Sequence, residues 1–356
     1  MPGTNLESPR VTLPTSVSAR IIAIAVLFVC IYFASSVVIT LVCSILIASV
    51  LEPGVKLMER LRIPRWVGSL LMVLLTLGIM YLLIYAVYDR AVAFMDDLPK
   101  LVAKLKQITE HIRSTAQTIR QSAQIVPPSS EANLPAVRLQ QESPWMQFLL
   151  RGIGSVYGFV VTVMFIPFLV FFMLTSKHQL WAATLNLFPV ERRQQAEDVI
   201  HAISQMLRQF VLGNLLVALI SAGLIVPVFA TLQLHYAVLL GLMAAFLSLI
   251  PYIGVALAIL PPLLVALLQY DTMQPFFILG VTVAVVHFLA VNFLTPKLVG
   301  RRVNLNALSV TIAMMFWGWL WGGVGLVLAV PITAAIKAVC DNVEKLKPYG
   351  AWLGES

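Results

Sequence analysis

The chain has 356 residues, of which 60% are hydrophobic and 11% are charged. Soluble domains carry about 45–50% apolar and about 25% charged residues, so this composition excludes a soluble globular protein and a disordered one. The net charge of +8 comes mostly from lysines and arginines beside hydrophobic runs, which indicates membrane topology rather than nucleic-acid binding. We therefore expect an all-α, polytopic membrane protein.

Uncharged stretches flanked by charged residues mark the expected membrane segments. About 20 helical residues cross the apolar core of a bilayer, so stretches of ordinary length predict single spans and the longest predicts several. Within 209–270, turn-forming residues predict breaks at 231–235 and 251–254. The stretches are 21–51, 66–88, 152–176, 209–270, 272–296 and 303–336.

Two of these stretches, 21–51 and 303–336, are long for one helix and short for two. Positive charges on both sides of each indicate that the chain returns to the side it left. We expect a short helix pair or a re-entrant hairpin in both, the first turning near Ser35 and Ser36. One long tilted helix is the alternative for the first. The total is seven or eight transmembrane helices with broken or re-entrant pairs.

The distribution of Lys and Arg gives the expected orientation. Sixteen of the 24 positive residues fall on one side, and the other eight lie in 89–151, which is long enough to be exempt from the positive-inside rule. Both termini should therefore be cytoplasmic. The expected parts are a cytoplasmic tail 1–20, a membrane hairpin and span 21–88, an extramembrane insert 89–151, a transmembrane domain 152–340 and a cytoplasmic tail 341–356.

The insert 89–151 is the one part that resembles a soluble protein. Its apolar residues recur at helical spacing over 98–112, with lysines and arginines on other faces, which predicts an extramembrane amphipathic helix. Packing or subunit contact and a membrane-surface position are the two interpretations. The Pro-, Ser- and Gln-rich residues 126–144 predict a loop.

Three clusters of helix-breaking residues lie in the apolar stretches. Irregular backbone at membrane depth lies against protein or a water-filled cavity, because its polar groups must be hydrogen-bonded. The first cluster holds Pro251, Tyr252 and Gly254, where proline blocks helix continuation and glycine permits a positive φ. It is either a simple interhelix turn or a break whose free backbone groups face a substrate.

The second cluster ends the stretch 272–296. Polar Asn292 and Thr295 precede a predicted helix stop at Pro296, and a basic turn follows. The arginine of that turn is either an interfacial anchor or a contact for an anionic or hydroxyl-rich solute. The turn contains Gly300, Arg301, Asn304 and Asn306.

The third cluster holds Trp317, Gly322 and Gly325, where several glycines weaken any helix. Close packing through small residues and an aromatic belt are the ordinary explanations. A hairpin tip that opens and closes over a pore is the functional alternative.

In this order, the three clusters resemble the autoinducer-2 exporter family of bacterial PerM-type permeases. The matching motifs are I-P-Y-I-G before a double proline, N-x-x-x-P-K-x-x-G-R, and G-W-L-W-G-G-V-G-L-x-L-A-V-P, and the resemblance extends from Glu52 to Lys337. It implies an inner-membrane transporter that forms a homo-oligomer, with a pentamer as the expected size. The best-known activity of the family is export of the quorum-sensing signal autoinducer-2, and other members resemble sodium- or lithium-proton antiporters.

One position departs from the family pattern. Many members carry His-Pro after the basic turn, where this chain has Asn306 and Ala307, so a role for that histidine does not carry over. The Phe-Trp-Gly-Trp-Leu stretch that begins at Phe316 resembles the signal-exporting members, which favours export of a signal molecule.

Ionisable residues distinguish the candidate transport classes. No Asp or Glu lies inside an uncharged stretch: Glu52 and Asp271 lie at edges, and His287 is the one ionisable residue well inside. Such residues are costly in a membrane and functional by default. His287 and Asp271 could therefore couple transport to protons, whereas an interhelical hydrogen bond is the ordinary explanation for His287. A small, neutral, hydroxylated solute fits this distribution better than an antiporter with buried carboxylates.

Other function classes lack their sequence signals. The phosphate-binding pattern G-x-x-x-x-G-K-[ST] is absent, no nucleophile and base are arranged as in an enzyme, and the three cysteines have no metal-ligand spacing. We expect no cofactor, no metal and no nucleic-acid partner. A membrane scaffold that recruits partners through a helix at 90–125 is the remaining non-transport alternative.

Overall fold

The computed structural model describes residues 22, 26, 29–123, 156–299 and 305–354. Every regular element among them is helical, which confirms the all-α prediction. The π-helical turn η2 (Ala290–Leu294) joins α10 to α11, and the 3-10 turns η1 (Val190–Arg192) and η3 (Glu344–Leu346) precede α7 and α13. The helices are α2 (Ser35–Arg60), α3 (Arg65–Ala123), α5 (Val156–Thr175), α6 (Lys177–Asn186), α7 (Arg193–Thr231), α8 (Ala237–Leu247), α9 (Gly254–Gln269), α10 (Met273–Leu289), α11 (Thr295–Leu298), α12 (Ala307–Asn342) and α13 (Lys347–Leu353).

Five helical segments are long and apolar enough to cross a membrane, which supports a multi-pass membrane protein. α8 and α9 are shorter, with 11 and 16 residues. They rise about 17 Å and 24 Å, so neither spans an apolar core of about 30 Å by itself. The total of seven or eight spans stays a prediction. The five segments are Ser35–Arg60, Arg65–Thr118, Val190–Thr231, Met273–Leu298 and Ala307–Asn342.

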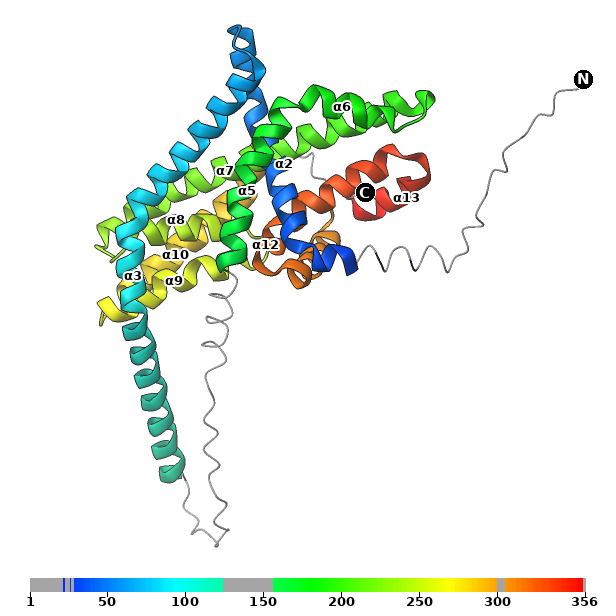
Figure 1. Ribbon diagram of the computed structural model, residues 1–356. Coiled ribbons are helices and arrows are strands. Elements are labelled where there is room, and N and C mark those ends of the chain that lie inside the picture. Colours follow the sequence, from blue (N-terminus) through cyan, green and yellow to red (C-terminus); the bar gives the residue numbers. More distant parts are fainter. Residues whose placement is uncertain (1–21, 23–25, 27–28, 124–155, 300–304, 355–356) are drawn as a thin grey trace, which may run out of the picture.

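α7 is the helix that connects most parts of the fold, in contact with α2, α6, α8, α10, α11 and α12 (Figure 1). Its C-terminal half packs on α8, α9 and α10 through a core that contains Phe229. Its N-terminal half packs on α2 and α12 through a core around Met206 and Leu207. A third core joins α2, α3 and α5 and contains Val55 and Leu174. Because α7 belongs to two of the four hydrophobic cores, a shift of this helix would disturb much of the membrane part.

The first apolar stretch contains a bend and one long helix instead of a hairpin. The chain bends at Ala34, and α2 then runs unbroken from Ser35 to Arg60, as the lower end of α2 in Figure 1 shows. The N–H groups of Ala34 and Val38 still bond to carbonyls four residues back, so little hydrogen bonding is lost at the bend. The hairpin turn predicted near Ser35 and Ser36 is therefore wrong for the described residues.

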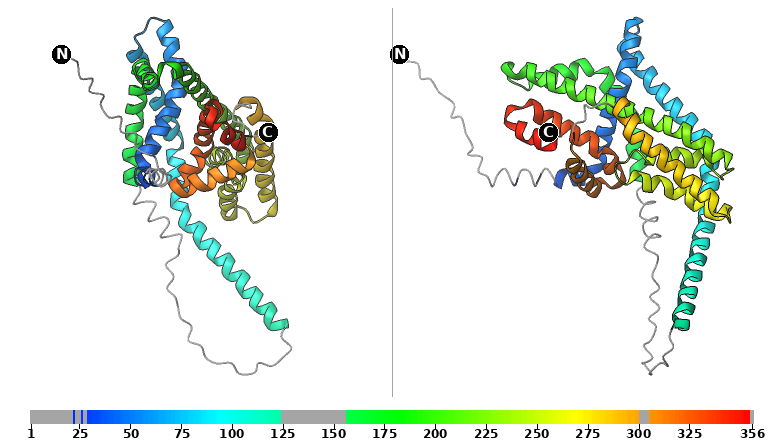
Figure 2. Two further views of the ribbon diagram at one scale, coloured as in Figure 1. Left: turned by 90° about the vertical axis from the view of Figure 1, so that its right-hand side faces the viewer. Right: turned by 180° about the vertical axis from the view of Figure 1, so that it is seen from behind.

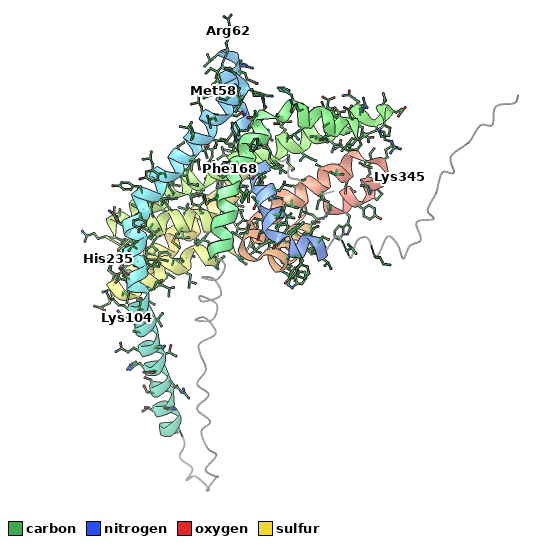
Figure 3. All side chains as sticks on the ribbon, viewed as in Figure 1. Met58, Arg62, Lys104, Phe168, His235 and Lys345 are labelled. Carbon is green, nitrogen blue, oxygen red and sulfur yellow. The ribbon has the colours of Figure 1, made fainter. Side chains whose placement is uncertain are left out.

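The expected span 66–88 and the expected amphipathic helix form one continuous helix, α3. Its 59 residues rise roughly 88 Å, almost three times the apolar thickness of a bilayer. The boundary expected at residue 89 consequently lies inside a helix. Both views of Figure 2 show the distal half of α3 standing apart from the other described helices, and Lys104 in Figure 3 lies on this projecting part.

Both breaks predicted within 209–270 are present. α7 ends at Thr231 and α8 begins at Ala237, and a second turn separates α8 from α9. At the first corner, Gln269 bonds the connecting turn: its Oε1 accepts from the backbone N–H of His235 at 2.8 Å, and its Nε2 donates to the carbonyl of Gln233 at 2.6 Å. Figure 3 shows His235 at this outer end of α7.

One hydrogen bond ties α3 to this corner. The Tyr236 hydroxyl donates to Oδ2 of Asp97 at 2.7 Å, and Lys100 Nζ lies 2.7 Å from the other carboxylate oxygen. The hydrogen bonds from Lys100 and Tyr236 lower the pKa of Asp97. The bond to Asp97 raises the pKa of Tyr236 to about 12, because an ionised phenolate would lose the bond and repel the carboxylate.

Asp97→Asn should therefore lower the pKa of Tyr236 toward the ordinary value of about 10. An ultraviolet difference titration of the tyrosines measures this shift, and Tyr236→Phe in both backgrounds isolates the signal of that ring. An identical titration in the two backgrounds would contradict the contact between α3 and the α7–α8 corner.

Candidate functional site

The turn between α8 and α9 holds the first predicted cluster. Its strained residue is Tyr252, with φ of 62°, and not Gly254, which begins α9 in an ordinary helical conformation. The prediction that Gly254 supplies a positive φ is therefore wrong. Glycine is needed there for space, because a Cβ would lie 2.7 Å from the Leu247 carbonyl oxygen and 2.9 Å from that of Ser248.

The second predicted cluster begins in a π-helical turn. Asn292 lies in η2, exposed, with its side-chain amide donating to the Phe288 carbonyl at 2.8 Å. The helix does not stop at Pro296, which was predicted to end it, but continues to Leu298. Pro296 falls in the first turn of α11, where its missing N–H breaks no helical bond. π-Turns of this kind are frequent at functional sites.

Part of this cluster lies outside the described residues, namely Gly300, Arg301 and Asn304. Asn306 is described and has a structural position. Its Oδ1 caps α12 by accepting from the Ser309 N–H at 2.7 Å, and its Nδ2 donates to the carbonyls of Trp352 and Gly354. The side chain expected to meet substrate is thus occupied in joining α12 to the C-terminal segment.

The third cluster forms the hairpin expected in 303–336. At Gly322, φ is 63° and ψ is −139°, a conformation that side-chain-bearing residues avoid, and there α12 turns back on itself. The two limbs pack closely, since a Cβ at Gly325 would overlap the carbonyl of Trp317. Trp317 also reaches the returning limb through Nε1, which donates to Thr333 Oγ1 at 3.3 Å.

The structure brings the first and third clusters together. The Tyr252 hydroxyl donates to the Ala307 carbonyl at 3.2 Å, so the first turn touches the start of α12. Ile250 of the same turn packs on a core that both limbs of the hairpin contribute to. Leu247, beside the turn, packs on a core that contains Val283 and Val286, which links α10 to the turn. We call the α8–α9 turn, the end of α10 and the hairpin of α12 the helix-break site.

The two expected proton-coupling residues are far apart. Asp271 is exposed in the turn before α10, and His287 lies half-buried near the end of that helix. Their separation of 16 residues corresponds to roughly 24 Å of helix. They cannot exchange a proton directly.

A buried ion cluster escaped the sequence analysis, which treated Glu52 as a residue at the edge of a stretch. Glu52 lies inside α2 with its side chain 9% exposed, 2.9 Å from Arg65 Nη2 and 2.8 Å from Lys177 Nζ. Arg65 also bonds Glu59 at 3.0 Å and the Leu174 carbonyl at 2.7 Å. The cluster thereby fastens α2 to the start of α3 and to the α5–α6 junction.

The spacing of Glu52, Lys56 and Glu59 could have revealed this cluster. These residues are four and three apart, which puts them on one face of a helix. The uncharged stretch ends at residue 51, so the continuation of α2 to Arg60 through Pro53 was not expected.

Comparison with known proteins gives a consistent result. A family model described as AI-2E family transporter matches residues 21–345. The AI-2 transport protein TqsA of Escherichia coli is 26% identical over 341 residues, covering 95% of each chain. Two further relatives are named "Putative transport protein", from Haemophilus influenzae (25% identical, 94% of this chain and 95% of the relative), and "Putative permease PerM", from Escherichia coli (26% identical, 93% and 94%).

Gly322 and Gly323 give a matched pair for testing the hairpin. An alanine side chain meets nothing within 4 Å at either position, so space does not distinguish them. Gly322→Ala should destabilise the fold by about 1–3 kcal/mol, because its backbone conformation is essentially confined to glycine. Gly323→Ala should be neutral or stabilise by about 0.5–1 kcal/mol. Denaturation in detergent measures both, and equal effects would contradict the reversal at Gly322.

The ion cluster gives a second pair. Glu52→Gln should cost about 2–4 kcal/mol of unfolding free energy, because it removes a buried carboxylate and leaves the largely covered Arg65, and the partly exposed Lys177, without their main counter-charge. Glu59→Gln removes a carboxylate that is 33% exposed and should cost about 0–1 kcal/mol. The same denaturation assay separates them, and a Glu52 variant no weaker than the Glu59 variant would refute the buried position.

Proposed function

Because the chain belongs to the AI-2E family of transporters, we propose that it is a bacterial inner-membrane permease that exports a small polar metabolite, with autoinducer-2 as the leading candidate. The solute crosses by alternating access at the helix-break site. The full-length similarity to the AI-2 transport protein TqsA supports the choice of solute.

Unpaired polar atoms on the elements of the helix-break site carry this proposal. His287 Nδ1, Ser309 Oγ and Trp321 Nε1 are buried and have no hydrogen-bond partner in the described part of the chain. A buried polar atom without a partner costs about 1–3 kcal/mol, so such atoms require an explanation. His287 Nδ1 and Ser309 Oγ can each accept or donate a hydrogen bond, and Trp321 Nε1 can donate one. This combination suits a neutral solute with several hydroxyl groups.

The hairpin of α12 is the moving part in this proposal. Its tip lies at Gly322, and near the tip the exposed Trp319 stacks on Tyr32 at 6.3 Å between ring centroids. Two helix breaks and a hairpin give elements that can shift relative to α7 without unfolding, as in transporters with discontinuous helices.

The proposed orientation has both termini in the cytoplasm. Arg65 and Lys177, both predicted to be cytoplasmic, meet at Glu52 and so lie at the same end of the bundle. The start of α7 and the end of α12 also meet, since Gln195 donates to the Asn342 carbonyl. A homo-oligomer, with a pentamer as the expected size, completes the proposal on the basis of the family resemblance.

The test uses protein reconstituted in sealed vesicles that contain a pH dye, with labelled autoinducer-2 supplied on one side. Signal movement with a steady internal pH is expected. A pH change driven by sodium or lithium pulses, without signal movement, would instead establish the antiporter. If the His287→Ala variant kept that pH change, the antiport activity would not depend on this histidine.

Ser309→Ala and Trp321→Phe test the role of the unpaired atoms. Each should lower the transport rate roughly two- to tenfold, the equivalent of one hydrogen bond to the solute. Ser309→Ala should not lower stability, because the hydroxyl it removes has no partner in the folded protein. Trp321→Phe also deletes part of a buried ring and should cost about 1–2 kcal/mol, so its transport rate is compared at equal amounts of folded protein. Ser69→Ala is the control: this buried serine donates to the Arg65 carbonyl in α3, away from the helix-break site, and its variant should transport normally. Wild-type rates in both test variants would refute the assignment.

A further inference from the structure

A pocket of about 470 Å³ opens between α2, α5, α6 and α7, apart from the residues of the helix-break site. Its volume is within the range of small-molecule sites. Its apolar wall comes from Ile45, Ala48, Met173, Leu174, Leu180, Ile200 and Trp181, and the Trp181 ring meets the His201 ring edge-on at 5.3 Å. Its polar lining is Ser49, Glu52, Lys56, Lys177, Thr184, His201, Ser204, Gln205 and Arg208.

Positive charge exceeds negative charge in this lining. Glu52 is the one carboxylate among the lining residues, and its charge is already balanced by Arg65 and Lys177. Lys56 and Arg208 also line the pocket and have no carboxylate partner within the part of the chain that the structure describes. Two cations that share a concave, partly apolar space without a counter-charge favour an anion between them.

The neutral groups of the pocket suit the same ligand. Ser204 and Gln205 lie next to each other on α7, one turn before Arg208, and both can donate hydrogen bonds. Arginine binds phosphate oxygens through two parallel N–H bonds, and lysine adds a point charge. Hydroxyl and amide donors satisfy the remaining oxygens. The apolar wall leaves room for a carbon skeleton beside the charged group.

We propose that this pocket binds a phosphate group carried by an organic molecule, with Lys56 and Arg208 as its principal cationic contacts. The expected orientation puts the pocket at the cytoplasmic side. Two sources supply such a group there: a soluble phosphate ester, or the headgroup of an anionic phospholipid. The proposed phosphate site does not depend on which solute is exported, so its test is independent of the test of the proposed function.

The ligand would join α2 and the α5–α6 junction, which the ion cluster also joins, to α7. Lys56 belongs to α2, Arg208 to α7, and Lys177 lies where α5 meets α6. A phosphate bonded to two or three of them adds a bridge from α2 across to α7. Binding should therefore raise the unfolding temperature of the full chain in proportion to ligand occupancy.

The experiment measures unfolding temperature for the full-length protein in nanodiscs of neutral phosphatidylcholine. Inorganic phosphate and glycerol 3-phosphate are titrated at constant ionic strength, and a second series replaces part of the neutral lipid with phosphatidylglycerol. A saturable rise in unfolding temperature with inorganic phosphate or glycerol 3-phosphate in neutral lipid identifies a soluble ligand. A rise only with phosphatidylglycerol identifies the lipid headgroup.

Variants of the pocket residues show whether the rise in unfolding temperature comes from binding in this pocket. Lys56→Gln with Arg208→Gln should weaken binding at least roughly tenfold, because each removes a charge-assisted contact. Lys345→Gln removes the same charge from an exposed position beside α13 and should behave as wild type (Figure 3). Lys56 is exposed, so Lys56→Gln alone should fold normally and still weaken binding if the double variant does not fold.

Two results would overturn the proposal. One is a rise that is the same in wild type and in the Lys56 and Arg208 variants, which marks a general salt effect. The other is the absence of any saturable rise with phosphate, glycerol phosphate or phosphatidylglycerol.

Discussion

Backbone hydrogen bonding in an apolar surrounding is the constraint that the rest of the structure depends on. A helix satisfies its own N–H and C=O groups, but each break frees several, and lipid offers them no partner. The breaks therefore occur where helices already touch. In the α8–α9 turn, the N–H groups of Ile250, Ile253 and Gly254 bond to carbonyls of the turn itself, and Tyr252 reaches Ala307.

Glycine serves these contacts in two physically different ways. Gly213, Gly254 and Gly325 lie where a Cβ would press on the backbone of another segment, so they set how closely two segments approach. Gly322 has free space but an unusual backbone conformation, so it sets where α12 reverses. The closely packed glycines therefore set distances between segments, and Gly322 sets the direction in which the chain continues. Movement of the hairpin would consequently change the packing at Gly325 before it changed the reversal itself.

The sequence predicted features that depend on neighbouring residues and missed those that depend on distant ones. Composition predicted the all-helical membrane protein, and local turn residues predicted both breaks in 209–270 and the reversal at Gly322. Pro296 was misread as a helix stop, because it falls in the first turn of α11. The ion cluster was missed because Lys177 is 125 residues from Glu52, and no local pattern records such a pairing.

The two polar regions of the membrane part differ in charge and share one helix. At the helix-break site the unpaired atoms are neutral hydrogen-bonding groups, whereas the pocket between α2 and α7 holds excess positive charge. Met206 and Leu207 of α7 pack toward the hairpin, while the adjacent Gln205 and Arg208 line the pocket. A ligand in the pocket can therefore act on the hairpin through α7 or α2, which both pack on it, and only if it binds one position of these helices more tightly than another. The affinity of the pocket for its phosphate ligand can be compared between the Gly322→Ala and Gly323→Ala variants. Gly322→Ala alters the hairpin and leaves the pocket residues unchanged, so a difference in affinity would measure the coupling between hairpin and pocket.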